Sequence, residues 1–316
     1  MLVSIVVPCY NEEEALPMFM EAVSIVRLGM KTDQGADTEM ILVDDGSKDG
    51  TLELIKGYNS EDESVHYVSF SRNFGKEAAI YAGLSEAKGD YVVLLDADLQ
   101  HPVEYIPKMY DILSGRGGDD TSYDSVAMYR PGRSKGEGRL RAHFSKRFFR
   151  MMNRLAKIDL VDGATDYRMM SRGMVDAVLS MQEYNRFTKG IFNWVGFNTK
   201  WLPYEDAERC AGSSKWSFKS LMRYAFEGMF AFSTRPLTIS FSLGLILCGL
   251  AILYAIVTVI KTLVWGDPVA GYPSLFTMIL LLGGIQLLFL GIFGQYMAKM
   301  YLEVKNRPIY ITKEKK

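Results

Sequence analysis

Short apolar runs alternate with amphipathic segments over about the first 130 residues of the chain. The runs are rich in Val, Ile and Leu and are bounded by polar or glycine-containing turns, which is typical of buried β-strands. The segments between them repeat their apolar residues at helical spacing. We therefore expect strands at 3–8, 40–44, 65–70, 91–95 and 125–129, and helices near 13–27, 51–58, 76–87 and 103–113.

Continuous apolar strands separated by helices favour an α/β fold with one mostly parallel sheet and helices on both faces. In such sheets ligands bind beyond the carboxyl ends of the strands. Four of the predicted strands are followed by polar clusters, namely CYNEE (9–13), DDGSKDG (44–50), SRNFGK (71–76) and DADLQHP (96–102). We expect these clusters to share one edge of the sheet and to form the functional site.

Two long segments near the C-terminal end, 237–260 and 274–298, contain no charged residue. Each reaches the roughly 20 residues that a membrane-spanning helix needs, a length at which two buried helices of a soluble core are a much weaker interpretation. Cationic residues flank the pair: Lys215, Lys219, Arg223 and Arg235 precede it, and Lys299, Lys305, Arg307, Lys313, Lys315 and Lys316 follow it. The positive-inside rule then predicts that the N-terminal region and the tail are cytoplasmic.

Two further segments, 139–157 and 216–232, mix basic residues with Phe, Met and Leu. They could be core helices with solvated charge, but their proximity to the apolar pair favours interfacial helices on anionic lipid. The expected organisation is a multi-pass protein of the cell membrane. Its parts are a cytosolic domain (1–210), a juxtamembrane amphipathic helix (211–235), two transmembrane helices (236–299) and a basic cytoplasmic tail (300–316).

Composition, cysteine spacing and the first residues of the chain argue against several other classes of function. Lys and Arg number 36 against 37 Asp and Glu, so the net charge of −1 gives no case for a nucleic-acid partner. The cysteines Cys9, Cys210 and Cys248 are far apart, which favours neither a disulfide framework nor a zinc site and fits a reducing compartment. The first residues also lack the charged region and cleavage site of a signal peptide.

The DADLQ segment holds the most informative polar residues. Asp96, Asp98 and Gln100 alternate, so on an extended segment their side chains point the same way. Paired hard oxygens suit Mg²⁺ or Mn²⁺, and a nucleotide diphosphate would supply further ligands. A metal site, a helix cap and a polar turn all stay open from these residues alone, because many loops contain a DxD.

The DDGS segment has two interpretations as well. Asp44 at a strand end could accept hydrogen bonds from a nucleobase and a ribose, with Gly46 permitting close approach of the backbone. Alternatively, Ser47 or Asp49 caps the helix that begins at Thr51.

The motifs VSIVVPCYNEE, ILVDDGSKDGT, FSRNFGKEAAIYAGL, GDYVVLLDADLQHP and DYRMMSR are followed by two apolar segments. In this order they resemble family 2 glycosyltransferases, and more narrowly the polyisoprenyl-phosphate type, which comprises bactoprenol glucosyltransferases and dolichol-phosphate mannose synthases. The resemblance covers nearly the whole chain. It implies a GT-A-type nucleotide-binding sheet, a nucleotide-sugar donor, a polyprenyl phosphate acceptor, a divalent cation and a homo-oligomer such as a tetramer.

The resemblance also implies roles for individual residues. The nucleotide-sugar site would comprise Pro8, Tyr10, Glu12, Asp44, Asp45, Lys76 and Asp96. Asp98, Gln100 and Asp96 would hold Mg²⁺ or Mn²⁺, and Asp98 would act in catalysis with Asp166 and Arg168. Here the family's Phe and Leu beside Asp166 and Arg168 are replaced by Tyr167 and Met169, and Asp162 is a second acidic candidate. Phosphate and acceptor binding would fall to Arg130, Arg133, Arg209, Ser214 and Lys215.

The expected reaction is inverting transfer of a hexose to undecaprenyl (bactoprenol) phosphate at the cytoplasmic face, for cell-envelope glycosylation. UDP-glucose is the preferred donor on family frequency alone; guanine nucleotides and other hexoses stay open. A processive polysaccharide synthase usually has a QxxRW motif and more spans, whereas this chain has RFTKGIFNW (186–194) and two apolar segments. A non-catalytic, membrane-anchored nucleotide-sugar binding protein is the third alternative.

Overall fold

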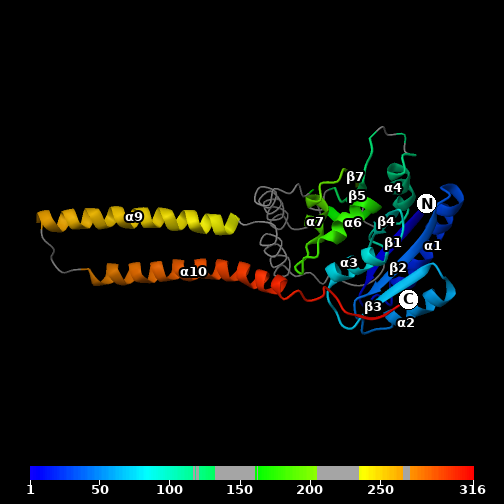
Figure 1. The fold of residues 1–316 in the computed structure, drawn as a ribbon, viewed down its shortest axis with the longest axis horizontal. Coiled ribbons are helices and arrows are strands. Elements are labelled where there is room, and N and C mark those ends of the chain that lie inside the picture. Colours follow the sequence, from blue (N-terminus) through cyan, green and yellow to red (C-terminus); the bar gives the residue numbers. More distant parts are fainter. Residues whose placement is uncertain (117, 119–120, 132–160, 162, 205–234, 266–270) are drawn as a thin grey trace. The chain divides into compact units, whose positions relative to one another are not determined.

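The computed structural model describes residues 1–116, 118, 121–131, 161, 163–204, 235–265 and 271–316. The chain forms two compact units, one of Met1–Ala225 with Arg307–Lys316 and one of Phe226–Asn306 (Figure 1). Both predicted interfacial helices, 139–157 and 216–232, lie outside the described residues.

The first unit is built on one sheet. Its described strands are β1 (Leu2–Cys9), β2 (Asp37–Asp44), β3 (Val65–Phe70), β4 (Tyr91–Leu94), β5 (Ser125–Tyr129), β6 (Ala164–Ser171), β7 (Thr199–Pro203) and β8 (Thr312–Lys315). They lie in the order β7-β5-β6-β4-β1-β2-β3-β8. Strands β1 to β4 are parallel to one another, while β6 and β8 are antiparallel to their neighbours. The predicted mostly parallel sheet is confirmed, and its order changes direction between β1 and β4, where open α/β sheets bind ligands.

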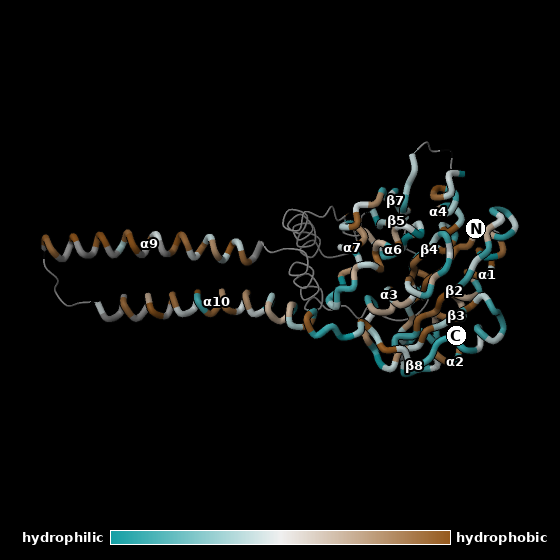
Figure 2. Tube along the Cα trace, in the orientation of Figure 1, coloured by the Kyte–Doolittle hydropathy of each residue, from teal (hydrophilic) through white to brown (hydrophobic). Residues whose placement is uncertain are grey.

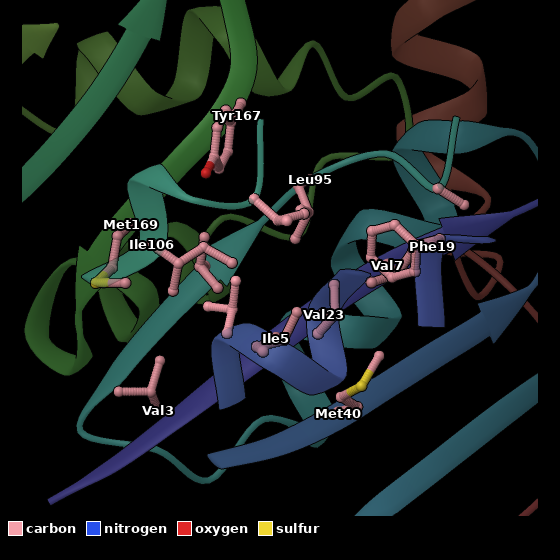
Figure 3. Packing of buried hydrophobic residues seen from close by; sticks show 14 of the residues in the cluster. Val3, Ile5, Val7, Phe19, Val23, Met40, Leu95, Ile106, Tyr167 and Met169 are labelled. Atoms are coloured by element: carbon pink, nitrogen blue, oxygen red, sulfur yellow. The ribbon is translucent and has the colours of Figure 1, made fainter. Parts of the chain in front are cut away.

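Helices cover both faces of this sheet, as its apolar strands require. The helices α1 (Leu16–Asp33), α2 (Thr51–Glu61) and α4 (Tyr105–Leu113) share one buried cluster with Val3, Ile5 and Val7 of β1 (Figure 3). On the opposite face α3 (Lys76–Glu86) places Gly83 against Val6 of β1. A Cβ on Gly83 would lie 2.3 Å from Val6 Cγ1, so only glycine lets this helix approach so closely.

Helix α1 begins three residues later than the sequence pattern predicts, at Leu16. The preceding amides donate to side chains of the loop after β2: Asn11 N–H to Ser47 Oγ, Glu12 N–H to Thr51 Oγ1 and Glu13 N–H to Asp49 Oδ2. These bonds tie the ends of β1 and β2 together. They also give Ser47 a partner in the neighbouring loop. Gly50 occupies the N-cap position of α2, and Asp49 Oδ1 accepts the Thr51 N–H at 3.1 Å, as the capping interpretation of Asp49 expected.

The predicted basic tail, 300–316, is not a free extension. Its first residues complete α10 (Tyr272–Val304), and Thr312–Lys315 form β8 along the outer side of β3. The sequence TKEK has no strand-like apolar pattern, so its conformation depends on pairing with an existing edge.

The second unit contains α9 (Arg235–Trp265) and α10, which contact each other. Both are long and apolar enough to cross a membrane, with candidate spans at Leu237–Tyr254 and Leu281–Val304. Neither span is buried against the rest of the chain, and Figure 2 shows apolar residues along both helices. The spans overlap the predicted segments 237–260 and 274–298.

Candidate functional site

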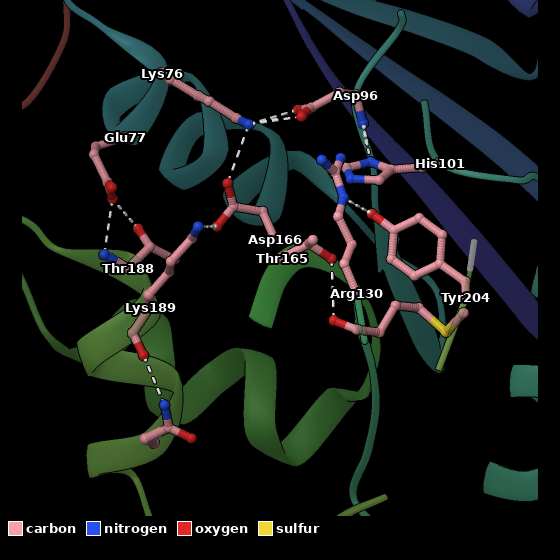
Figure 4. Close-up of polar contacts among 12 residues, drawn as sticks. Lys76, Glu77, Asp96, His101, Arg130, Thr165, Asp166, Thr188, Lys189 and Tyr204 are labelled. Carbon is pink, nitrogen blue, oxygen red and sulfur yellow. Dashed lines mark hydrogen bonds and ion pairs between the residues drawn. The ribbon is translucent and has the colours of Figure 1, made fainter. Parts of the chain in front are cut away.

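Four acidic and basic side chains from separate elements meet beyond the carboxyl end of β4 (Figure 4). Lys76 is the first residue of α3, Asp96 follows β4, and Asp166 lies in β6. The Nζ of Lys76 lies 2.7 Å from Asp96 Oδ1 and 3.1 Å from Asp166 Oδ2. One ammonium therefore holds together two carboxylates that would otherwise repel each other.

A second lysine approaches Asp166 from the other side. Lys189 belongs to α7 (Thr188–Trp194), and its Nζ lies 3.9 Å from Asp166 Oδ1. Burial alone would raise the pKa of Asp166, but the charges of Lys189 and Lys76 outweigh it and hold that pKa well below its usual range. Burial likewise opposes ionisation of Asp96, yet Lys76 lowers its pKa. Both carboxyl groups are consequently ionised at neutral pH.

The position of Lys189 depends on a buried contact between helices. Glu77, next to Lys76 on α3, accepts hydrogen bonds from the backbone N–H of Thr188 at 2.9 Å and from the Thr188 hydroxyl. This contact fixes the first turn of α7 and thereby its second residue, Lys189. Sequence analysis missed Lys189, although it lies in the RFTKGIFNW stretch that was compared with the polysaccharide synthase motif.

The loop after β4 has a defined shape. Asp98 Oδ1 accepts the backbone N–H of Gln100 at 3.1 Å, and Leu99 adopts a left-handed φ of 56°. The backbone N–H of Asp96 donates to Nδ1 of His101, whose ring stacks on Tyr167 at 5.1 Å. Burial lowers the pKa of His101, so the ring stays neutral and can accept this bond.

Asp44 and Asp45 are buried and engaged by the protein itself. Asp44 accepts hydrogen bonds from Ser47 N–H at 3.0 Å and from the Ser69 hydroxyl at 2.8 Å. Asp45 accepts the N–H groups of Phe74 and Gly75 at the start of α3. The expected donor-binding role of Asp45 stays a prediction; in this structure its carboxylate holds the loop that leads to Lys76.

The remaining expected residues divide into three groups. Pro8, Tyr10 and Glu12 lie at the end of β1, on the edge shared with Asp44 and Asp96. Arg130 follows β5, where its Nε donates to Tyr204 Oη at 2.7 Å. Arg133, Arg209, Ser214, Lys215 and the second acidic candidate Asp162 lie outside the described residues.

Arg168, which the resemblance places in catalysis with Asp98 and Asp166, has its side chain inside the protein in this structure. Its guanidinium carbon lies 3.9 Å from the ring centre of Phe192, and its Nε has no hydrogen-bond partner among the described residues. Burial lowers its pKa to about 10, against the opposing effect of Asp166. In this conformation Arg168 packs against Phe192 of α7.

The oxygen ligands beyond β4 fit a divalent cation only when a bound substrate supplies further ligands. In the described residues no group of three or more His, Cys, Asp and Glu side chains could hold a metal ion. Asp98 and Gln100 offer oxygen atoms beyond β4, while the carboxylate of Asp96 is paired with Lys76. Mg²⁺ commonly binds through one or two carboxylates and the phosphates of its substrate, which this set allows.

Comparison with known proteins then identifies the family. Residues 4–179, from β1 to α6 (Arg172–Ser180), match the model described as glycosyl transferase family 2. The chain belongs to this family. The GT-A-type α/β fold that the resemblance implied is therefore confirmed.

Curated members of family 2 resemble this glycosyltransferase over their full lengths. The bactoprenol glucosyl transferase of Shigella phage SfV is 40% identical over 316 residues, covering 100% of this chain and 99% of the relative. The prophage-derived bactoprenol glucosyl transferase of Shigella flexneri is 40% identical over 314 residues, covering 99% and 98%. The prophage homologue of Escherichia coli (strain K12) is 38% identical and covers 100% of both chains.

Solved structures are more distant. Glucosyl-3-phosphoglycerate synthase from Mycobacterium tuberculosis, in complex with Mn²⁺, UDP and glucosyl-3-phosphoglycerate, has a TM-score of 0.43 and 21% identity, covering 72% of this chain and 77% of its own. A mannosyltransferase from Pyrobaculum calidifontis, in complex with GDP-mannose and Mn²⁺, has a TM-score of 0.45 and 16% identity, covering 95% and 84%.

Proposed function

We propose that the protein transfers a hexose, with glucose preferred, from a nucleotide sugar to a polyprenyl phosphate such as undecaprenyl phosphate. The observation that carries this proposal is the full-length similarity to bactoprenol glucosyl transferases, which extends through both apolar helices. A soluble donor and a lipid acceptor require an active site near a membrane surface. Two spans with cationic flanks support a catalytic unit on the cytoplasmic side.

The donor site is proposed at the ends of β1, β2 and β4. Tyr10 and Glu12 would contact the nucleoside. The carboxylate of Asp44 would accept one further hydrogen bond, from the base or the ribose. Because Asp44 is also held by Ser47 and Ser69, it can accept such a bond without having to change position. Uridine and guanosine donors both fit this chemistry, so the donor base is an outcome of the experiment below.

Departure of the nucleotide diphosphate places negative charge beside the two lysines. An ammonium has three N–H donors, so Lys76 can contact a phosphate oxygen while it keeps its contacts with Asp96 and Asp166. Lys189 supplies a second positive charge from α7. Preorganised cations of this kind stabilise a leaving group without reorganisation during the reaction. A Mg²⁺ or Mn²⁺ ion held by Asp98, Gln100 and the diphosphate would supply Lewis-acid stabilisation of the same charge.

The acceptor is proposed to attack the anomeric carbon directly, which inverts its configuration. A phosphate monoester has a second pKa of about 6 and is mostly dianionic at neutral pH, so it needs no strong base. Asp166 is suited to another task, because a carboxylate with such a low pKa accepts protons poorly. We infer that Asp166 orients the sugar and the two lysines, and that Arg130 helps to hold the acceptor phosphate.

The proposal is tested with the full chain in lipid nanodiscs and undecaprenyl phosphate. Labelled UDP-glucose, UDP-galactose, UDP-N-acetylglucosamine and GDP-mannose are offered separately, with Mg²⁺ or Mn²⁺. The expected product is one lipid-linked hexose, with inverted configuration by NMR. A growing polymer would instead identify a polysaccharide synthase, and binding of a donor without any product would identify a non-catalytic binding protein.

A further inference from the structure

Strand β8 closes the edge of the sheet beside α3. It pairs antiparallel with β3, placing Lys315 opposite Val68 and Glu314 opposite Ser69. The pairing is extended by bonds between Tyr67 and Lys316 in both directions, and by one from Ser71 N–H to Ile311 O at 3.0 Å. The segment that follows the second apolar helix is therefore an integral part of the catalytic unit.

Tyr310, just before β8, joins two elements of the catalytic unit. Its ring stacks on Phe70, the last residue of β3, with centroids 4.7 Å apart and planes at 21°. The same ring meets Tyr81 of α3 edge-on at 6.5 Å. Between Phe70 and α3 the chain makes only the short loop 71–75, so Tyr310 contacts the elements on both sides of that loop.

The loop continues this aromatic packing toward the site. Phe74 meets Phe70 edge-on with centroids 5.8 Å apart, and the guanidinium carbon of Arg72 lies 4.0 Å from the Phe74 ring centre. The N–H of Phe74 is held by the buried carboxylate of Asp45. Two residues after Phe74 comes Lys76, whose ammonium bridges Asp96 and Asp166.

Two ion pairs also connect β8 to the neighbouring helices. Lys315 lies 2.8 Å from Glu86 at the end of α3, and Glu314 lies 2.8 Å from Lys56 of α2. All four side chains are partly exposed, and pairs of this kind contribute little to stability. Besides the backbone bond from Ser71 to Ile311, the ring contacts of Tyr310 are consequently the main side-chain link between the C-terminal segment and the elements on both sides of the loop.

We propose that Tyr310 is a positioning residue for Lys76: it braces the Phe70–Phe74 packing and α3, and so holds the ammonium between Asp96 and Asp166. The C-terminal segment thereby contributes to the active site without touching substrate. The significance for catalysis rests on the proposed function, in which Lys76 binds the donor diphosphate. The brace itself is independent of the reaction.

The first experiment measures the brace alone. Hydrogen–deuterium exchange of the full chain in nanodiscs is followed in peptides covering 71–80, with peptides from β1 as an internal reference for global stability. Tyr310→Ala is expected to increase exchange in 71–80 but not in β1. Tyr310→Phe, which keeps the stacking ring, and Lys313→Ala, an exposed position of the same strand, are expected to match the unaltered protein. Unchanged exchange in Tyr310→Ala would overturn the proposal.

The second experiment tests the connection to Lys76 through binding of UDP with Mn²⁺ by calorimetry. Loss of the ring contact is expected to raise the Kd about three- to tenfold, with recovery in Tyr310→Phe. In a Lys76→Met background the same change should have little further effect, because coupled residues are non-additive. Fully additive effects would show that Tyr310 does not act through Lys76. If no nucleotide binds the unaltered chain, the proposed donor is wrong, and the exchange measurement decides the inference by itself.

Discussion

The ammonium of Lys76 lies 3.1 Å from a carboxylate oxygen of Asp166, although these residues come from a helix and a strand that are distant in the sequence. This pair connects the two halves of the site. Lys76 belongs to the part derived from β1 to β4, and Asp166 to the antiparallel strand β6 that extends the sheet. A change to Lys76 should therefore affect both donor binding and sugar transfer, whereas a change to Asp166 should act mainly on the transfer.

Lys76→Met is predicted to lower kcat about 100-fold or more, the scale observed when one preorganised electrostatic group is removed. The substitution keeps most of the side-chain length but removes the charge that would stabilise the leaving diphosphate. Initial rates at saturating donor and acceptor provide the measurement. Lys88→Met, at an exposed lysine just beyond the same helix, is the matched control and should retain normal turnover.

The same substitution should also alter stability in a pH-dependent way. The folded-state pKa values of Asp96 and Asp166 are lowered, so their stabilising contribution is present above about pH 4 and is lost as the pH falls. Without Lys76 the part of this contribution that depends on its charge is lost, while Lys189 still acts on Asp166. The Tm deficit of Lys76→Met relative to the unaltered chain should therefore be larger at pH 7 than at about pH 2, below the unfolded-state pKa of these carboxyl groups. Equal deficits at both values would show that the ion pairs do not stabilise the fold.

Asp166→Asn is predicted to reduce kcat strongly while leaving donor binding largely intact. The amide keeps the shape of the carboxylate but no longer balances Lys76 and Lys189, which would lose their common partner. Titration calorimetry with UDP-glucose separates binding from turnover. Asp176→Asn on α6, where the side chain is exposed, serves as the control. A Kd that rises in parallel with the loss of kcat would contradict an orienting role.

Asp98→Ala is predicted to abolish transfer and to weaken binding of Mn²⁺ in the presence of UDP. Electron paramagnetic resonance of Mn²⁺ gives a readout that does not depend on turnover. Asp33→Ala, at the exposed end of α1, should leave Mn²⁺ binding unchanged. Normal turnover of the Asp98 variant at saturating Mn²⁺ would remove this residue from the metal site.

Glu77→Ala is predicted to lower kcat/KM about tenfold, because the start of α7 would lose its buried acceptor and Lys189 its fixed position. Glu77→Gln retains an acceptor oxygen and should have a smaller effect. Lys189→Met provides the decisive comparison. The kcat/KM of the double variant Glu77→Ala/Lys189→Met should be no lower than that of Lys189→Met alone. Glu53→Ala, exposed on α2, is the control.

The strands β1 to β5 could be predicted because buried parallel strands need continuous apolar sequence, and their residues supply it. Their polar ends then predicted that Asp44 and Asp96 lie at the same edge of the sheet. The pattern did not predict β6, where Asp166 and Arg168 interrupt the apolar residues. It also did not predict β8, because the four polar residues TKEK form a strand only when a partner is present.

The functional site could likewise be predicted only in part from the sequence. Residues within one motif, such as Asp96, Asp98 and Gln100, could be grouped by their spacing. Lys189 could not, because its position depends on the contact of Glu77 with Thr188, two residues far apart in the sequence. The spacing within DDGS also could not predict that the carboxylate of Asp45 accepts hydrogen bonds from the amides of Phe74 and Gly75, which lie in the next polar cluster of the sequence.

The pairing of β8 with β3 has a practical consequence for protein production. A soluble version cut before α9 would lose β8 and leave the backbone groups of β3 unpaired along the edge of the sheet. Uncovered edges of this kind are sites of aggregation and strand exchange between molecules. Joining residues 307–316 to the shortened domain through a flexible linker would restore the missing partner, and it offers a rational route to crystals of the catalytic unit alone.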